Sequence, residues 1–115
     1  MKIAIVGSRG WTDWNRFEDE LAARVTPEWK TVVSGGAIGV DAAARVWAKK
    51  RGLDVREFLA DWNRYGKSAG MRRNADIIGY ADEVIAFWDG TSRGTRNSIE
   101  RTKAAGKACV VITAL

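Results

Sequence analysis

The chain opens on Lys2-Ile3-Ala4-Ile5-Val6, a short apolar run that leads directly into the turn Gly7-Ser8-Arg9-Gly10. This pattern is typical of a buried strand that ends in a tight turn. The same pattern recurs twice: residues 31–33 precede the turn Ser34-Gly35-Gly36-Ala37-Ile38-Gly39, and residues 83–88 precede the turn at 89–95. Two more strands are expected at residues 54–59 and 108–112.

Helical patterns separate these strands. We expect helices at residues 14–25, 40–51, 69–80 and 95–105, the first capped by Thr12 or Asp13 and ended by Pro27. The polar stretch 61–70, which carries Trp62 and Tyr65, is expected to be a loop or a lid. Because strands and helices alternate throughout, the sequence predicts an α/β fold: a single Rossmann-like three-layer domain over residues 1–115, with a five-stranded parallel sheet in the order 3-2-1-4-5.

Composition limits the function classes. The 115 residues are 46% hydrophobic, which is enough for one core. The single cysteine, Cys109, lies in an apolar run, so we expect a buried, inert thiol and a reducing compartment. No basic segment followed by an apolar one opens the sequence, and no apolar run reaches the length of a membrane helix, so we expect a cytoplasmic protein without membrane contact. The chain has no histidine, so the common transition-metal sites and histidine-based triads fall away.

The glycine-rich turns are the candidate ligand site. In a parallel sheet of this order, ligands bind outside the carboxyl ends of the strands, where the strand order reverses. Glycines let a phosphate approach the backbone, and a helix N-terminus stabilises its charge; tight turns, however, also need glycine when no ligand is present. The net charge of +5 and the pI of 9.7 favour an anionic partner such as a nucleotide or a nucleic acid. The predicted ligand-binding residues are Gly7, Ser8, Arg9, Trp11, Ser34, Gly35, Gly36, Ala37, Gly39, Asp41, Arg73, Asn74, Trp88, Asp89, Gly90, Ser92, Arg93, Gly94 and Thr95.

Several of these side chains have a structural alternative. Trp11 and Trp88 flank two of the turns and could stack on a base, although core packing is equally expected for Trp88. Asp41 and Asp89 could bond to ribose hydroxyls, or could cap a helix and brace a loop.

Ordered motifs along the whole chain resemble one family. They are Gly7-Ser8-Arg9 with Trp11, Ser34-Gly35-Gly36-Ala37 with Gly39 and Asp41, Ala60-Asp61-Trp62, Tyr65-Gly66-Lys67, Ala69-Gly70, Arg73-Asn74, Ala86-Phe87-Trp88-Asp89-Gly90 and Ser92-Arg93-Gly94-Thr95. Together they resemble the YspA-like branch of the SLOG superfamily. That superfamily also holds the DNA-processing protein of natural transformation and the Lonely Guy phosphoribohydrolases. The resemblance implies a Rossmann-like fold and a nucleotide-type ligand.

The resemblance to the Lonely Guy enzymes is incomplete. Those enzymes cleave the N-glycosidic bond of a nucleoside monophosphate with an arginine, whose place Arg73 takes, and a glutamate after a Gly-Thr turn, which Gly94-Thr95 matches. The glutamate's place falls on Ser98. Glu100 lies about 200° around the helix from the glutamate's place, so it is no simple substitute. If hydrolysis occurs, Arg73 with Asp41 or Asp89 are the candidate catalytic residues.

Three functions therefore remain open: a nucleotide-binding or sensor domain as the leading hypothesis, a nucleotide N-glycosidase, and a single-stranded nucleic-acid binding protein. No metal site and no certain cofactor is predicted, and Mg²⁺ is expected only together with a phosphate ligand. Apolar helix faces on so small a sheet favour a homodimer or a larger homo-oligomer.

Overall fold

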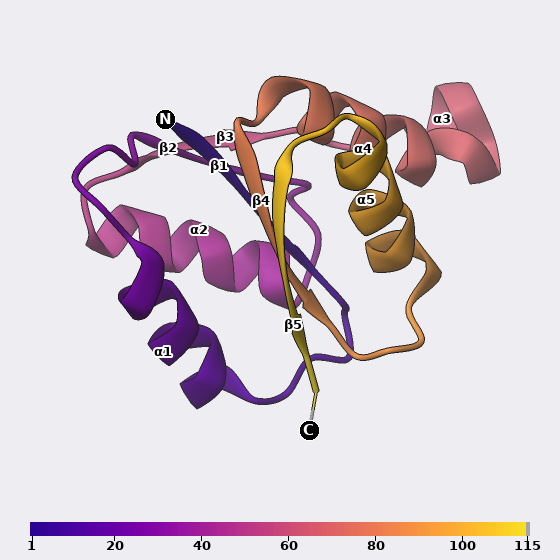
Figure 1. Ribbon diagram of the computed structural model, residues 1–115. Coiled ribbons are helices and arrows are strands. Elements are labelled where there is room, and N and C mark those ends of the chain that lie inside the picture. Colours follow the sequence, from indigo (N-terminus) through magenta and orange to yellow (C-terminus); the bar gives the residue numbers. More distant parts are fainter. Residues whose placement is uncertain (115) are drawn as a thin grey trace.

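The computed structural model describes residues 1–114 as alternating strands and helices (Figure 1). The elements, in chain order, are β1 (Lys2–Gly7), α1 (Trp14–Arg24), β2 (Thr31–Ser34), α2 (Val40–Lys50), β3 (Asp54–Glu57), α3 (Trp62–Tyr65), a 3₁₀ turn (Gly66–Ser68), α4 (Ala69–Tyr80), β4 (Glu83–Trp88), α5 (Arg93–Ala104) and β5 (Ala108–Thr113). All strand pairs are parallel, in the order β3-β2-β1-β4-β5. The predicted α/β class and strand order are confirmed.

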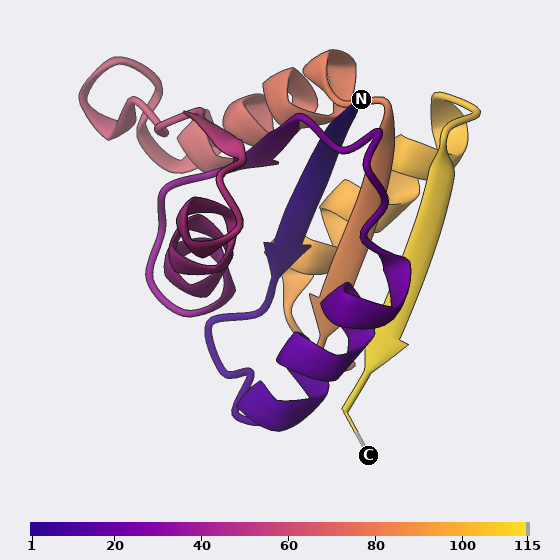
Figure 2. The same cartoon turned by 90° about the vertical axis from the view of Figure 1, so that its left-hand side faces the viewer.

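Helices cover both faces of the sheet, α1 and α2 on one side and α4 and α5 on the other (Figure 2). The alternation along β1 explains this, because Ile3 and Ile5 pack into the core under α1 and α2, whereas Ala4 and Val6 pack into the core under α4 and α5. The core under α1 and α2 contains buried aliphatic and aromatic side chains, whereas the buried side chains of the core under α4 and α5 are all aliphatic. The strand is therefore apolar from Ile3 to Val6, the four positions at which it is buried.

The largest difference from the sequence prediction is at residues 61–70. This stretch is not an open loop: Asp61 caps α3 by accepting a hydrogen bond from the Arg64 N–H at 3.1 Å, and α3 runs through the 3₁₀ turn into α4. α3 and the 3₁₀ turn are each too short for a helical period of apolar residues to be visible in the sequence. The polar composition of the stretch therefore suggested a loop. No side chain of α3 or of the 3₁₀ turn is buried.

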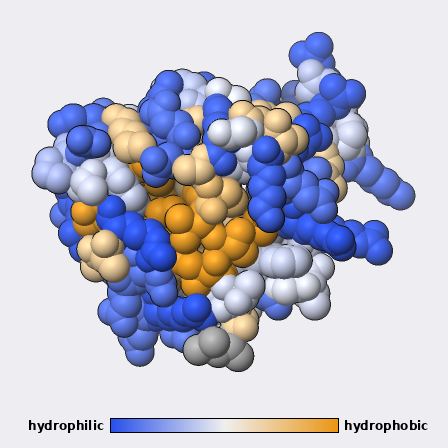
Figure 3. Space-filling view, in the orientation of Figure 1, coloured by the Kyte–Doolittle hydropathy of each residue, from blue (hydrophilic) through white to orange (hydrophobic). Residues whose placement is uncertain are grey.

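Cys109 also differs from its predicted environment. The thiol is half-buried rather than buried, because β5 is an edge strand, and partial burial raises its pKa. Apolar side chains gather at the centre of the face over which β5 runs (Figure 3). Along residues 1–114, no helix is long and apolar enough to cross a membrane.

Candidate functional site

A cavity of about 410 Å³ lies at the carboxyl end of the sheet. The loops that follow β1 and β4 leave the sheet at this end (Figure 1), and the cavity also takes in the first turns of α2, α4 and α5. Its size is within the range of small-molecule sites. The lining residues are Val6, Gly7, Arg9, Gly10, Ala37, Ile38, Asp41, Trp62, Lys67, Gly70, Met71, Arg73, Asn74, Ile77, Asp89, Ser92, Gly94, Thr95 and Ser98.

The first turn of α5 contributes backbone donors to the cavity wall. The side chain of Ser92 caps the helix by accepting from the Thr95 N–H at 3.4 Å. The N–H groups of Arg93 and Gly94 precede the intrahelical bonds, and neither donates to another group among residues 1–114. Since Gly94 also lines the cavity, the N-terminus of α5 can bind an anion there.

Asp89 holds the loop in front of α5. Its Oδ1 accepts from the N–H of Thr91 at 2.9 Å and of Ser92 at 2.8 Å, and these bonds lower the pKa of the carboxyl. The residue thus stays ionised and rigidifies the loop. This matches the loop-bracing alternative that the sequence left open.

Hydroxyl groups join the loop after β1 to α5. Thr95 Oγ1 lies 3.3 Å from Ser8 Oγ and 3.2 Å from Ser92 Oγ, and Ser8 Oγ accepts from the Asp89 N–H at 3.1 Å. Ser8 is 1% exposed and does not line the cavity. Its side chain fixes the relative position of the two loops, while Ser92 and Thr95 present themselves to the cavity.

Arg73 connects α4 to the turn before α2. Its Nη1 donates to the Gly35 carbonyl at 2.8 Å, and its Nε donates to Asn74 Oδ1 at 3.1 Å. The Nδ2 of Asn74 in turn donates to the Gly94 carbonyl at 3.3 Å. Arg73 therefore stands in the cavity wall with its guanidinium held in place by these contacts.

Asp41 is the most buried acid of the site. Its Oδ2 accepts from the Ala37 N–H at 3.2 Å. Burial raises the pKa of this carboxyl above its ordinary value of 3.8, although the Ala37 hydrogen bond and the nearby Arg73 charge oppose the shift. A raised pKa of this kind is typical of carboxyl groups that act as general acids or bases.

Ten of the predicted ligand-binding residues line this one cavity: Gly7, Arg9, Ala37, Asp41, Arg73, Asn74, Asp89, Ser92, Gly94 and Thr95. The cavity lining does not include Ser8, Trp11, Ser34, Gly35, Gly36, Gly39, Trp88, Gly90 or Arg93. Most of these shape the turns instead. Gly36, for example, has φ +68°, and a Cβ there would lie 2.4 Å from Leu59 Cδ2.

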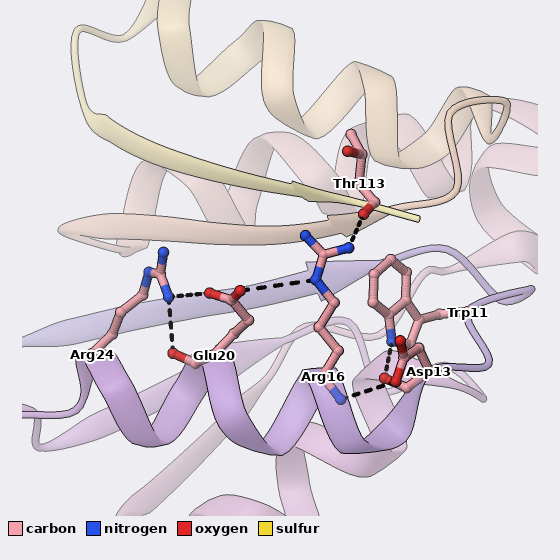
Figure 4. A network of polar contacts seen from close by, with 6 residues as sticks. All are labelled: Trp11, Asp13, Arg16, Glu20, Arg24 and Thr113. Atoms are coloured by element: carbon pink, nitrogen blue, oxygen red, sulfur yellow. Dashed lines mark hydrogen bonds and ion pairs between the residues drawn. The ribbon is translucent and has the colours of Figure 1, made fainter. Parts of the chain in front are cut away.

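Neither tryptophan expected near a base faces the cavity. Trp11 is 3% exposed, its ring packs edge-on against Phe87, and its Nε1 donates to the Asp13 carbonyl at 2.9 Å at the start of α1 (Figure 4). Trp88 packs against the core under α4 and α5 and donates to the Ser92 carbonyl at 3.1 Å. Core packing, the structural alternative, accounts for both side chains.

One wall of the cavity was not among the ligand-binding residues predicted from the sequence. Trp62, Lys67, Gly70 and Met71 line it from α3, the 3₁₀ turn and the start of α4. A tryptophan and a lysine in an otherwise polar stretch were the available signal. Val6, Gly10, Ile38, Ile77 and Ser98 complete the set of lining residues that were not predicted.

The charges in the wall are mixed. Arg9, Lys67 and Arg73 are opposed by Asp41 and Asp89, so the cations outnumber the carboxylates. Within residues 1–114, no group of three or more metal-ligating side chains is found.

Comparison with known proteins identifies relatives in sequence. The model of the YspA, cpYpsA-related SLOG family matches residues 1–65. The Gene 61 protein of Mycobacterium phage D29 is 38% identical over an alignment of 115 positions, and the alignment covers 91% of this chain and 90% of that protein.

Two solved structures share the fold. DNA processing protein A from Helicobacter pylori, described with a single-stranded DNA binding mode, superposes with a TM-score of 0.72 at 23% identity, over 96% of this chain and 64% of that one. DNA processing protein A (DprA) from Streptococcus pneumoniae superposes with a TM-score of 0.78 at 22% identity, over 99% of this chain and 50% of that one. This chain thus corresponds to 64% and 50% of the length of these two structures, and the likeness concerns the fold.

Proposed function

Because the chain belongs to the YspA, cpYpsA-related SLOG family, we propose that it binds a nucleotide or a nucleotide-derived phosphate ligand in the cavity at the carboxyl end of its sheet, as a sensor or binding domain. The observation that carries the proposal is that two sets of hydrogen-bond donors of the kind that bind phosphate lie in one cavity. They are the open first turn of α5 at Gly94 and the fixed guanidinium of Arg73.

The chemistry of the wall favours a phosphate in particular. Backbone N–H groups at a helix N-terminus and an arginine fork both recognise phosphate oxygens, and the hydroxyls of Ser92 and Thr95 add donors. Gly94 leaves the backbone accessible, since no atom beyond its chain neighbours and the backbone of its own helix lies within 4 Å of the position that a Cβ would take. Mg²⁺ enters this proposal only as a companion of the phosphate.

N-glycosidic hydrolysis is a second candidate, for which Arg73 and Asp41 on one cavity wall are the supporting observation. Asp89 is less suited, because its Oδ1 is engaged in holding the loop. Ser98, which takes the place of the glutamate of the related hydrolases, is 2% exposed and lines the cavity, so it supplies no carboxylate there. This favours binding over turnover.

Single-stranded nucleic-acid binding is the third candidate. The positive net charge and the fold shared with a protein that binds single-stranded DNA support it. Such binding is expected to weaken steeply with salt, because several phosphate contacts release counterions. The affinity for a single nucleotide bound in the cavity is expected to depend on salt much less.

The experiment is a titration with AMP, ADP-ribose, NAD and cyclic nucleotides, followed by isothermal calorimetry and by thermal stability, with chromatography of each mixture for released base. We expect saturable binding with the ligand intact. Arg73→Ala should weaken it, whereas Arg101→Ala, on the exposed part of α5 and outside the cavity, should not.

Release of free base would replace binding with hydrolysis as the function, and Asp41→Asn should then abolish the release. If no small nucleotide binds but an oligonucleotide does, with a steep salt dependence, the third candidate holds. Absence of binding to both classes would refute the proposal.

A further inference from the structure

The cavity has a floor that combines polar groups with the buried Val6 and Ile77, and a mouth where exposed apolar side chains lie beside the basic Arg9 and Lys67. The floor carries Arg73, Asp41 and the first turn of α5. The mouth carries three large apolar side chains that water reaches, namely Ile38 at 72%, Trp62 at 54% and Met71 at 38% exposure. Scattered single apolar residues on a surface are normal, but three around one cavity indicate a surface that a ligand covers.

Trp62 is held over this mouth by the backbone of α4. A Cβ built on Gly70 would lie 3.3 Å from Cη2 and 3.9 Å from Cζ2 of the indole, so the ring rests on the bare first turn of that helix. Asp61 caps the turn that carries Trp62, and the Gly66 N–H donates to the Trp62 carbonyl. The ring is thus supported on one side while half of its surface stays open.

The floor and the mouth together select the ligand. A phosphate on α5 leaves the rest of the ligand to extend past Arg73 toward the mouth, where a flat group with an open π face gains from stacking on the indole. Nucleobases have this character, and stacking on an aromatic ring is a common way to bind them. A sugar phosphate without a base leaves the three apolar side chains in water.

We propose that Trp62 is the base-stacking platform of the site, so that a nucleotide unit binds with its phosphate at the first turn of α5 and its base on the indole. This inference rests on the function proposed above and adds to it a preference for base-bearing ligands. The nucleotide unit is either a free mononucleotide or one residue of a single strand, and the two sources are separated below.

The test compares AMP with ribose 5-phosphate on the whole chain, by calorimetry and by tryptophan fluorescence. The wild type should bind AMP more tightly. Trp62→Leu should weaken the binding of AMP by about five- to 150-fold, which is the effect of one lost base–aromatic stack. The affinity for ribose 5-phosphate should stay unchanged. Trp62→Phe should keep most of the affinity for AMP.

Trp14→Leu is the matched control, because Trp14 is 40% exposed on α1 and lies outside the cavity. AMP should quench tryptophan emission in this control and in the wild type, but not in Trp62→Leu. A four-residue oligodeoxyadenylate that binds more tightly than AMP, with the same loss in Trp62→Leu, would assign the unit to a strand. AMP that binds more tightly than the oligonucleotide would assign it to a free nucleotide.

The two proposals fail differently. If ribose 5-phosphate and AMP bind equally well, or if Trp62→Leu weakens both alike, the base platform is refuted and phosphate binding stands. If the wild type binds neither the two small ligands nor the oligonucleotide, the proposed function is refuted together with this inference.

Discussion

Gly94 is a position where folding and binding make opposite demands. It is the second residue of α5, and a Cβ there meets no atom within 4 Å beyond its chain neighbours and the backbone of α5. Alanine is favoured over glycine in a helix by about 0.5–1 kcal/mol, so Gly94→Ala should fold at least as stably as the wild type. The added methyl group, however, narrows the cavity beside the backbone donor on which we place the phosphate.

Both effects have a size. A gain of about 0.5–1 kcal/mol raises the melting temperature of a domain of this length by about 2–6 °C. Loss of one hydrogen bond to a charged group costs about 1.5–3 kcal/mol, which weakens binding by about 12- to 150-fold. The variant should therefore melt higher and bind AMP less tightly.

Gly79→Ala is the matched control for this experiment. Gly79 lies in α4, has no atom within 4 Å of a built Cβ, and lies outside the cavity lining, so its replacement should raise stability and leave AMP binding alone. Thermal melts by circular dichroism and AMP calorimetry on the three proteins decide the matter. If Gly94→Ala binds AMP as tightly as the wild type, the phosphate does not lie at the first turn of α5. If the variant melts at a lower temperature than the wild type, the space around Gly94 is not open.

Three further predictions concern charge, helix termination and assembly. Burial raises the pKa of Asp41 above 3.8, so the folded protein holds the proton of this carboxyl more tightly than the unfolded chain does. The free energy of unfolding therefore falls as the pH rises from about 3.8 through the raised pKa of the folded state. The melting temperature of Asp41→Asn should exceed that of the wild type at pH 7 and the excess should vanish near pH 4; equal melting at pH 7 contradicts this. Lys107 Nζ donates to the carbonyls of Ile78 at 2.6 Å and Ala81 at 2.7 Å at the end of α4. Lys107→Met should therefore lower the free energy of unfolding in urea by about 1–2 kcal/mol, whereas the same change at the exposed Lys103 should not. Equal urea midpoints for the two variants would show that Lys107 does not stabilise the end of α4. We also propose that the apolar surface over β5 (Figure 3) joins two copies of the chain: Val111→Lys should lower the mass in sedimentation equilibrium, and a monomeric wild type would end the proposal.

β1, β2 and β4 were predictable because each combines an apolar run with a glycine-bearing turn that only a few residue types can make, whereas β3 shows only a weak alternation of apolar and polar residues. β4 and α4 have the bounds that the sequence predicts, and α1 begins at Trp14 as predicted, capped by Asp13, whose Oδ1 accepts from the Arg16 N–H at 3.0 Å (Figure 4). Local chemistry of this kind is visible in single residues. The location of the cavity followed from the topology, since parallel strands end at one edge.

Residue roles within the site were less predictable, because one residue type serves two purposes. Gly7 lines the cavity, yet a Cβ there would lie 2.6 Å from Val40 Cγ2 and 2.8 Å from the Phe87 carbonyl oxygen, so packing alone requires glycine. Trp11 and Trp62 both adjoin turns, but one closes the core and the other covers the cavity. Only the tertiary arrangement separates these cases.

The segment from Trp62 to Ser68 forms part of the cavity wall without burying a single side chain. Substitutions there meet almost none of the constraints that hold β1 or β4, where most positions are closed to water. On the function proposed above, substitutions in this short segment are expected to change which base is accepted, while the groups proposed to hold the phosphate and the buried strands stay unchanged. The same separation makes the segment a natural target for directed selection of new ligand preferences.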